Sequence, residues 1–288
     1  AAIYAKRAKL SSLTIEANFA SGGQVLNTYE VDNYPGLPGI SGMDLGSTLR
    51  AHAEKMGAEF SRERVKELVL DEEIKIVRTR KNEYHAKTVI LATGAEHRAL
   101  NVPGEKELSG MGVSYCATCD GAFYKDKTVA VIGGGDTALG DAMYLSRMAK
   151  KVYLVHRRQE FRANQALQTA VQQNAAIELV LDAVPTAVLG EKRVDHLELL
   201  QNGASKTLPV DGVFVAIGSI PNTDFLGDLC KLDESGYILA DETGVTTTPG
   251  VFAAGDVRTT PLRQVVTAVA DGANCVQSIE QYFRKGNG

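Results

Sequence analysis

The sequence predicts an α/β protein built from strand–helix–strand units, and two stretches carry that prediction. Val129–Ile132 is a short apolar run that leads into Gly133-Gly134-Gly135, and a helical pattern follows from Thr137 to Ala149. Lys151–Val155 is a second apolar strand directly after that helix. Because parallel strands need a crossover connection, this order indicates a parallel sheet of the Rossmann-like type.

The elements before this unit are a mixture of helix and strand. We expect a helix in residues 1–10, a strand at Leu13–Glu16, a loop over 18–42 and a helix that Asp44 caps and that ends near Gly57. Three runs then alternate in the manner of strands: 58–70, 73–80 and 83–91.

The elements after it continue the same alternation. We expect a helix at 163–174, several strands within 177–217, strands near Tyr237–Ala240 and Val251–Ala254, and a long helix from about Leu262. The opening helix and the strand at Leu13–Glu16 are the later parts of a strand–helix–strand unit. We therefore expect that residues are missing at the N-terminus, among them the first strand of that sheet.

Composition excludes several classes of function. The chain has 288 residues, 44% of them hydrophobic and 23% charged, with a net charge of −4, which is ordinary for a soluble globular protein and argues against nucleic-acid binding. No apolar run reaches the roughly 20 residues that cross a membrane. Charged residues stand where a secretory signal needs its apolar region, and four cysteines are too few for a disulfide scaffold. We expect a cytoplasmic protein.

The glycine turn is the first candidate binding site. Gly133, Gly135 and Ala138 have the G-x-G-x-x-A spacing of dinucleotide-binding turns, with Thr137 inside the motif. Glycines allow a pyrophosphate to approach the backbone at the N-terminus of a helix. A glycine turn alone is weak support, because such turns are common. The flanking strands and helix favour a dinucleotide site here.

A basic cluster at the end of the second strand indicates which dinucleotide binds. NAD sites carry an acidic residue about 20 positions after the turn. This chain instead has His156, Arg157 and Arg158, followed by Arg162. Guanidinium groups bind a 2′-phosphate through paired hydrogen bonds, so we predict NADPH. The alternative is a solvated basic turn, which accounts poorly for three arginines.

Two cysteines precede this unit, and three kinds of site compete for them. Cys116 and Cys119 could be half of a zinc site, a structural disulfide or a redox couple. Zinc is disfavoured because Cys230 and Cys275 are isolated and no histidine has ligand spacing; we predict no metal site. A C-x-x-C pair suits thiol–disulfide exchange. Asp120 would be positioned to protonate a leaving thiolate, although Asp before glycine is also typical of a turn.

A hydride donor and a disulfide require an intermediate carrier, and flavin performs that chemistry. Three glycine-containing segments from both ends of the chain suggest a single FAD site: Gly22-Gly23-Gln24, Ala92-Thr93-Gly94 and Ala254-Gly255-Asp256.

With these motifs assembled, the chain closely resembles the low-molecular-weight thioredoxin reductases. The likeness runs from residue 1 to the C-terminal helix. Its motifs are Cys-Ala-Thr-Cys-Asp at 116–120, the glycine turn at 133–138, the basic cluster at 156–162, Gly-Gly-Gln at 22–24, Asn33-Tyr34-Pro35-Gly36, Ala-Thr-Gly at 92–94, Gly255-Asp256 and Arg263-Gln264-Val265.

The resemblance implies two Rossmann-like domains, one for FAD and one for NADPH. The FAD domain is discontinuous (1–98 and 222–288) and encloses an NADPH domain (99–221). It also implies a homodimer, a thioredoxin substrate, and rotation of the NADPH domain on linkers near 98–102 and 218–222.

The resemblance also implies roles for individual residues. Cys119 would face the flavin, Cys116 would attack the disulfide of thioredoxin, and Asp120 would be the acid. Residues implied to hold FAD are Gln24, Asn33, Asp256, Arg263, Gln264 and Val265; those implied to hold the 2′-phosphate are Arg157, Arg158 and Arg162.

Two departures from the family pattern stand out. The first strand and its glycine-rich FAD turn do not precede Ala1. Gly140 occupies a helical position where relatives commonly carry Glu, so we expect a weaker helix and an effect on how the nicotinamide end is held.

Three rival functions remain open at this stage. One is a flavoprotein reductase that serves a peroxidase or another thioredoxin-like partner, although relatives of that kind carry an additional N-terminal segment. Another is a ferredoxin-dependent disulfide reductase, although such proteins lose the arginine cluster. The third is a flavin-free, NADPH-sensing module with a cysteine switch, which the absent first strand alone supports.

Overall fold

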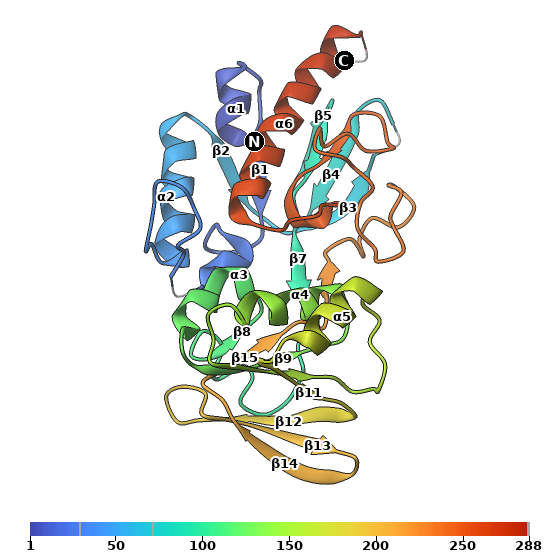
Figure 1. The fold of residues 1–288 in the computed structure, drawn as a ribbon. Coiled ribbons are helices and arrows are strands. Elements are labelled where there is room, and N and C mark those ends of the chain that lie inside the picture. The colour runs from blue at the N-terminus through green and yellow to red at the C-terminus, as the bar shows by residue number, and fades with distance from the viewer. Residues whose placement is uncertain (29, 71, 287–288) are drawn as a thin grey trace. The chain divides into compact units, whose positions relative to one another are not determined.

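The computed structural model describes residues 1–28, 30–70 and 72–286, and the chain divides into two compact units (Figure 1). Ala1–Glu96 and Ile220–Gly288 together form the first, called here the discontinuous unit. His97–Ser219 forms the second, called the inserted unit. The predicted α/β class is confirmed, with parallel sheets in both units.

The core of the inserted unit is a five-stranded parallel sheet with the order β11-β10-β9-β15-β8. The predicted strand–helix–strand unit is present as β9 (Thr128–Ile132), α4 (Asp136–Leu145) and β10 (Lys151–Val155). The other strands are β8 (Val113–Ser114), β11 (Ile177–Val180) and β15 (Gly212–Val215).

Both faces of this sheet are covered. On one face lie α4 and α5 (Gln165–Gln173), which pack on side chains such as Val131 and Phe214 (Figure 1). On the other lies an antiparallel sheet of β12 (Ala183–Leu189), β13 (His196–Gln201) and β14 (Ala204–Pro209). The central strands β9 and β15 therefore read as nearly continuous apolar runs, because they are buried on both sides.

The helix after the glycine turn ends at Leu145, four residues before the predicted end at Ala149. Beyond Leu145 the chain tightens into a turn in which the Met148 N–H donates to the Leu145 carbonyl (3.0 Å). Asn174 donates to the Ser146 hydroxyl at 2.8 Å and holds this turn against the chain that follows α5. A side chain from far along the sequence thus supports the turn in which the helix ends.

In the part of the chain that the structure describes, the discontinuous unit contains three small sheets. β1 (Leu13–Glu16) pairs in parallel with β2 (Glu59–Arg62), and β6 (Val89–Leu91) pairs in parallel with β17 (Val251–Ala253). The third sheet is antiparallel and consists of β3 (Val65–Val69), β4 (Lys75–Thr79) and β5 (Glu83–Ala86). β7 (Ala95–His97) and β16 (Ser219–Pro221), which connect the units, pair with each other.

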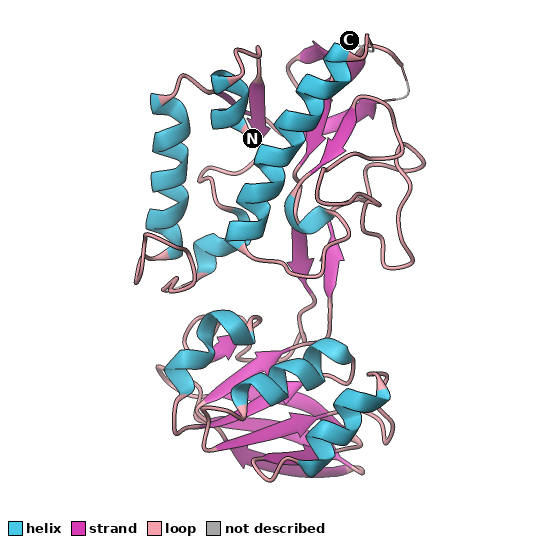
Figure 2. Cartoon of the chain, turned by 45° about the horizontal axis from the view of Figure 1, so that its top comes forward, coloured by secondary structure: helices cyan, strands magenta, loops and turns pink. Residues whose placement is uncertain are grey.

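The helices of this unit are α1 (Ala2–Arg7), α2 (Gly42–Lys55) and α6 (Val265–Arg284). Figure 2 shows α6 as the long helix of this unit, and its Cys275 and Ile279 pack with Phe252 of β17. The short 3-10 helix η1 (Gly23–Asn27) lies inside the segment predicted as loop.

Three predictions about these elements are wrong in detail. Ser41, not Asp44, caps α2, because the Ser41 hydroxyl accepts the Asp44 N–H at 3.0 Å. The terminal helix begins at Val265 rather than Leu262, because Gln264 is its N-cap and exchanges hydrogen bonds with Thr267. The segment Tyr237–Ala240 is no strand: Ile238 makes isolated bridges only, and its apolar character reflects burial.

Candidate active site

The redox pair lies directly after strand β8. Cys116 and Cys119 form a disulfide. Cys116 is the N-cap of the short helix α3 (Ala117–Asp120), and its Sγ accepts the Cys119 N–H at 3.2 Å. A hydrogen bond to sulfur favours the thiolate over the thiol. After reduction, this N–H would therefore stabilise a nucleophilic Cys116.

Asp120 is the last residue of α3, and its carboxyl group lies in the same motif as the two cysteines. Burial raises the pKa of Asp120, while a hydrogen bond from the Ser114 hydroxyl (2.6 Å) lowers it. A carboxyl group with a raised pKa retains a proton over a wider pH range, which suits an acid next to a leaving thiolate.

A second carboxylate fixes the residue before Cys116. Glu105 is buried, and it accepts the N–H groups of Leu100 (2.8 Å) and Asn101 (2.7 Å) and the hydroxyl of Tyr115 (2.9 Å). The Tyr115 ring also stacks on His97 with centroids 5.2 Å apart. The start of the inserted unit and the chain leading into the disulfide therefore share one buried anchor.

The predicted dinucleotide turn has no space for side chains at its first two glycines. A Cβ on Gly133 would lie 2.3 Å from the Ala216 carbonyl, and a Cβ on Gly134 would lie 2.2 Å from the His156 ring. A Cβ on Gly135 would meet nothing within 4 Å. Ala138 is buried against Gly133. The turn is thus closely packed at Gly133 and Gly134 and open at Gly135. In dinucleotide-binding turns of this spacing, the phosphate approaches the backbone at that glycine.

The basic segment is tied to this turn through the main chain. The Arg162 N–H donates to the Gly134 carbonyl at 2.7 Å, and Asp136 accepts two bonds from Asn164, each of 2.8 Å. In the part of the chain that the structure describes, no ion pair involves the exposed guanidinium groups of Arg157, Arg158 or Arg162. Three cations without a protein counter-ion beside a helix N-terminus fit a phosphate-bearing ligand.

The other residues predicted at this site differ in exposure. His156 is buried, its ring stacks on Phe161, and its pKa is lowered first by burial. Thr137 is exposed on the first turn of α4. The structure therefore gives His156 a packing contact and leaves Thr137 accessible.

In the discontinuous unit, side-chain hydrogen bonds join the segments predicted to form one site. Gln24, beside Gly22 and Gly23 on η1, donates to the Ala95 carbonyl. Asn33 donates to the Gln264 side chain at 2.9 Å, next to Val265 at the start of α6. These bonds bring residues far apart in sequence to one region.

Four further interactions complete this assembly. Thr93, beside Gly94, donates to the Asn222 carbonyl (2.8 Å), and Asn222 donates back to the Thr93 carbonyl (2.9 Å). Asp271 of α6 accepts the Gly255 N–H at 2.9 Å and pairs with the buried guanidinium of Arg258 at 2.6 Å.

One buried group in this region lacks a partner. Among the described residues, the Nε of Arg263 is buried without a hydrogen bond, although its guanidinium lies 4.0 Å from the centre of the Tyr237 ring. Burial raises the pKa of nearby Asp256, and the charge of Arg263 opposes that rise. A guanidinium with an unsatisfied Nε beside the half-buried carboxyl group of Asp256 fits a ligand with both anionic and hydroxyl groups, as FAD has.

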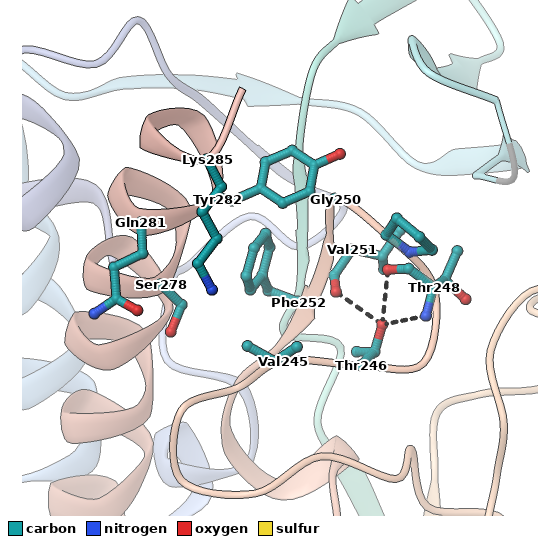
Figure 3. Close-up of a pocket in the computed structure, with 11 residues that line it drawn as sticks. Val245, Thr246, Thr248, Gly250, Val251, Phe252, Ser278, Gln281, Tyr282 and Lys285 are labelled. Carbon is teal, nitrogen blue, oxygen red and sulfur yellow. Dashed lines mark hydrogen bonds between the residues drawn. The ribbon is translucent and has the colours of Figure 1, made fainter. Parts of the chain in front are cut away.

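A cavity of about 210 Å³ in the discontinuous unit is lined by none of the predicted site residues. Figure 3 shows how its lining side chains lie. Its lining includes Thr246, Thr248, Phe252, Gln281, Tyr282 and Lys285. The Thr246 hydroxyl donates to the Val251 carbonyl at 2.8 Å, so it is already satisfied. None of the described residues that line this cavity carries a thiol or carboxyl group, and Cys116 and Cys119 are not among them.

Sequence reasoning missed three supporting residues, namely Ser114, Glu105 and Asp271. Serine and glutamate are common, and their spacing from Cys116 carries no signal. Asp271 could have been identified from the sequence, because a carboxylate within an otherwise apolar helical stretch needs a partner.

Comparison with known proteins places the chain in a family. The model for pyridine nucleotide-disulphide oxidoreductases matches residues 1–272. This protein therefore belongs to the pyridine nucleotide-disulphide oxidoreductase family, and the predicted pair of Rossmann-like folds is confirmed.

Particular relatives narrow that class. The thioredoxin reductase of Listeria innocua is 44% identical over 99% of this chain and 90% of its own length, and that of Bacillus subtilis is 42% identical over 99% and 91%. The crystal structure of thioredoxin reductase from Streptococcus pyogenes is 40% identical, covers 99% of this chain and 94% of its own, and superposes with a TM-score of 0.92. The resemblance to the low-molecular-weight thioredoxin reductases is confirmed.

Two properties of the described residues bear on other functions. No helix among them is long and apolar enough to span a membrane. None of their histidine, cysteine, aspartate and glutamate side chains form a cluster that could hold a metal ion.

Proposed function

We propose that this protein is an NADPH-dependent thioredoxin-disulfide reductase that uses FAD. The observation that carries the proposal is the Cys116–Cys119 disulfide with an N–H on Cys116 Sγ and a half-buried carboxyl group at Asp120. The names and identities of the relatives support a thioredoxin substrate over a peroxidase-feeding partner.

The chain's own residues account for the thiol–disulfide half of the reaction. In the reduced protein, the Cys116 thiolate attacks one sulfur of the thioredoxin disulfide, and the other sulfur leaves as a thiolate that takes a proton from Asp120. Cys119 then attacks the Cys116 sulfur. The Cys116–Cys119 disulfide re-forms as Cys119 gives up its thiol proton, the second thioredoxin thiolate leaves and takes up that proton, and thioredoxin departs with two thiols.

The remaining predicted residues have binding roles in this proposal. The turn from Gly133 to Ala138 and the guanidinium groups of Arg157, Arg158 and Arg162 would hold NADPH. Segments 22–24 and 93–94, together with Asn33, Asp256 and Arg263–Val265, would hold FAD. Bound FAD supplies a carrier that takes two electrons as hydride and passes them to the disulfide.

A homodimer and a cytoplasmic location complete the proposal. The resemblance supports the dimer. The two remaining cysteines, Cys230 and Cys275, are buried free thiols, which is compatible with a reducing compartment.

An anaerobic titration with NADPH tests the proposal. We expect a visible flavin band that bleaches, and an uptake of two electron pairs in the wild-type protein but one in Cys119→Ser. Thiol counting after the titration should show two new thiols in the wild type only. Absence of a flavin band after incubation with FAD would contradict the proposal, as would a wild-type protein that takes up only one electron pair.

A further inference from the structure

We propose that Ser114 is a positioning residue that holds the Asp120 carboxylate at the redox pair and thereby sets the pH range in which Asp120 acts as an acid. The second part of this inference rests on the proposed function, because it assumes that Asp120 protonates a leaving thiolate.

The Ser114 hydroxyl joins both ends of the redox motif. It lies at the end of β8, is 4% exposed, accepts the Cys116 N–H at 3.1 Å and donates to Asp120 Oδ2 at 2.6 Å. A hydroxyl has one proton to donate and lone pairs to accept, so the two bonds are compatible. A longer contact with the Cys116 carbonyl, at 3.4 Å, competes for the same proton less well.

This hydrogen bond favours the ionised form of Asp120. Burial acts in the opposite direction, and the net pKa of Asp120 remains raised. Loss of the hydroxyl leaves burial unopposed, so the pKa of Asp120 rises further. The bond is also stronger after Asp120 has given up its proton, because a charged acceptor shortens and strengthens it. Ser114 therefore stabilises the product of proton transfer.

Neighbouring titratable groups do not replace this effect. Tyr124, on the 3-10 helix η2 (Gly121–Tyr124), interacts with Asp120, but burial raises the pKa of Tyr124 to about 12, so it remains protonated while Asp120 titrates. Arg193 and Asp211 act on Tyr124 with opposite signs.

The charged groups on the elements around α3 are not among the causes that shift the pKa of Asp120, which are burial and the Ser114 hydrogen bond. From α4, which packs against α3, come Asp141 and Tyr144; burial alone raises the pKa of Asp141. From β8 comes Tyr115, whose hydroxyl is engaged by Glu105. Ser114 is thus the side chain that donates a hydrogen bond to Asp120.

The direct test is a ¹³C NMR titration of the Asp120 carboxyl carbon in the full-length oxidised protein, with the signal assigned from Asp120→Asn. We expect Ser114→Ala to raise the pKa of Asp120 by about one unit, as loss of a hydrogen bond to a charged group implies. Ser146→Ala, which removes a serine hydroxyl elsewhere in the same unit, should leave it unchanged. An unchanged pKa in Ser114→Ala would overturn the inference.

An isosteric pair guards against a packing artefact. Ser114→Thr keeps the hydroxyl and Ser114→Val replaces it with a methyl group of the same shape, and both suit a strand. Threonine should preserve the wild-type titration and valine should reproduce the alanine shift. If the pKa of Asp120 shifted equally in both variants, the side-chain volume and not the hydroxyl would be responsible, and the inference would be wrong.

Turnover against pH then separates this inference from the proposed function. We expect Ser114→Val to move the alkaline fall in kcat for thioredoxin reduction upward by the same amount as the NMR shift. If Asp120→Asn turns over normally at every pH, the acid role fails although the NMR shift stands. If the NMR shift is absent while Asp120→Asn is inactive, only the positioning role fails.

Discussion

The two units hold their candidate sites together by different means. In the inserted unit, main-chain contacts dominate: the Gly133 N–H donates to the Val155 carbonyl (3.0 Å), and the Arg162 N–H donates to the Gly134 carbonyl (2.7 Å). In the discontinuous unit, side chains make the connections, as with Asn33 to Gln264 at 2.9 Å and Asp271 to Gly255 at 2.9 Å.

This difference has a physical cause. The inserted site lies within one stretch of about 30 residues on a continuous parallel sheet, where glycines let backbones approach closely. The discontinuous site draws on segments more than 200 residues apart, and polar side chains bridge them. We therefore expect that substitutions which add side-chain atoms disrupt the site of the inserted unit. Substitutions that remove a polar side chain should instead disrupt the site of the discontinuous unit.

The largest effect should come from removing Asp271. In Asp271→Ala the buried guanidinium of Arg258 loses both of its carboxylate bonds, and the free energy of unfolding should fall by about 3–5 kcal/mol. Urea denaturation measures the loss. Loss of the Gly255 contact should also weaken FAD retention, which flavin fluorescence reports.

An exposed ion pair in the inserted unit is the matched control. Lys151 and Glu178 lie 2.6 Å apart at the surface, so Glu178→Ala should cost less than about 1 kcal/mol. The comparison between the units breaks down if Glu178→Ala costs as much as Asp271→Ala.

The next effect should come from adding one carbon atom to the inserted unit. Gly133→Ala places a Cβ against the Ala216 carbonyl and imposes a positive φ of 152° on a non-glycine residue, at a cost of about 2–3 kcal/mol. Gly135→Ala has an ordinary φ of −100° and open space, so its cost should stay below about 1 kcal/mol. Equal midpoints of thermal unfolding for the two variants would contradict the close-packing account.

A charge inside the inserted unit should lower stability in a pH-dependent manner. Burial raises the pKa of Asp141 to about 6 from 3.8, so the folded protein keeps a proton that the unfolded chain releases. Stability should therefore fall as pH rises from about 4 to about 6, and the cost above pH 6 should reach at most about 3 kcal/mol.

Asp141→Asn removes this cost. The variant should be more stable than wild type at pH 8, and the difference should vanish near pH 4. Urea denaturation at both pH values measures it, and a difference of the same size at both would show that the charge is not responsible.

The smallest effect should be a gain. Gly140 lies inside α4 and a Cβ there would meet no atom within 4 Å, so Gly140→Ala should stabilise the protein by about 1 kcal/mol. Gly134→Ala on the same thermal assay should destabilise it, because its Cβ would overlap the His156 ring. A destabilised Gly140→Ala would mean that α4 requires the flexibility of glycine.

The sequence allowed the inserted unit to be predicted well, since its strands are buried on both faces and its glycine turn is contiguous. The arrangement of the discontinuous unit was harder to predict. Tyr237–Ala240 has the apolar character of a strand, yet only Ile238 makes isolated bridges, and the segment is apolar because Tyr237, Ile238 and Ala240 are buried while Leu239 is exposed. Serine and aspartate are both typical N-cap residues, so the sequence did not distinguish Ser41 from Asp44. The structure shows that Ser41 caps α2.

At the candidate site, the chemically reactive groups could be predicted and their supports could not. Cysteines, a glycine turn and an arginine cluster have recognisable spacing. Ser114 and Glu105 act through contacts that the fold creates, with no spacing rule to mark them. Roles for the individual binding residues remain predictions.

The chain leaves and re-enters the discontinuous unit at neighbouring points, since the Asn222 N–H donates to the Gly94 carbonyl at 2.9 Å. The inserted unit likewise begins and ends side by side, with the Arg98 N–H on the Gly218 carbonyl at 3.0 Å. Adjacent ends are the condition for one domain to be placed within a surface turn of another. A short turn from Gly94 to Asn222 would close the discontinuous unit without the inserted unit. The two units can therefore be encoded by separate genes and later recombined into one chain.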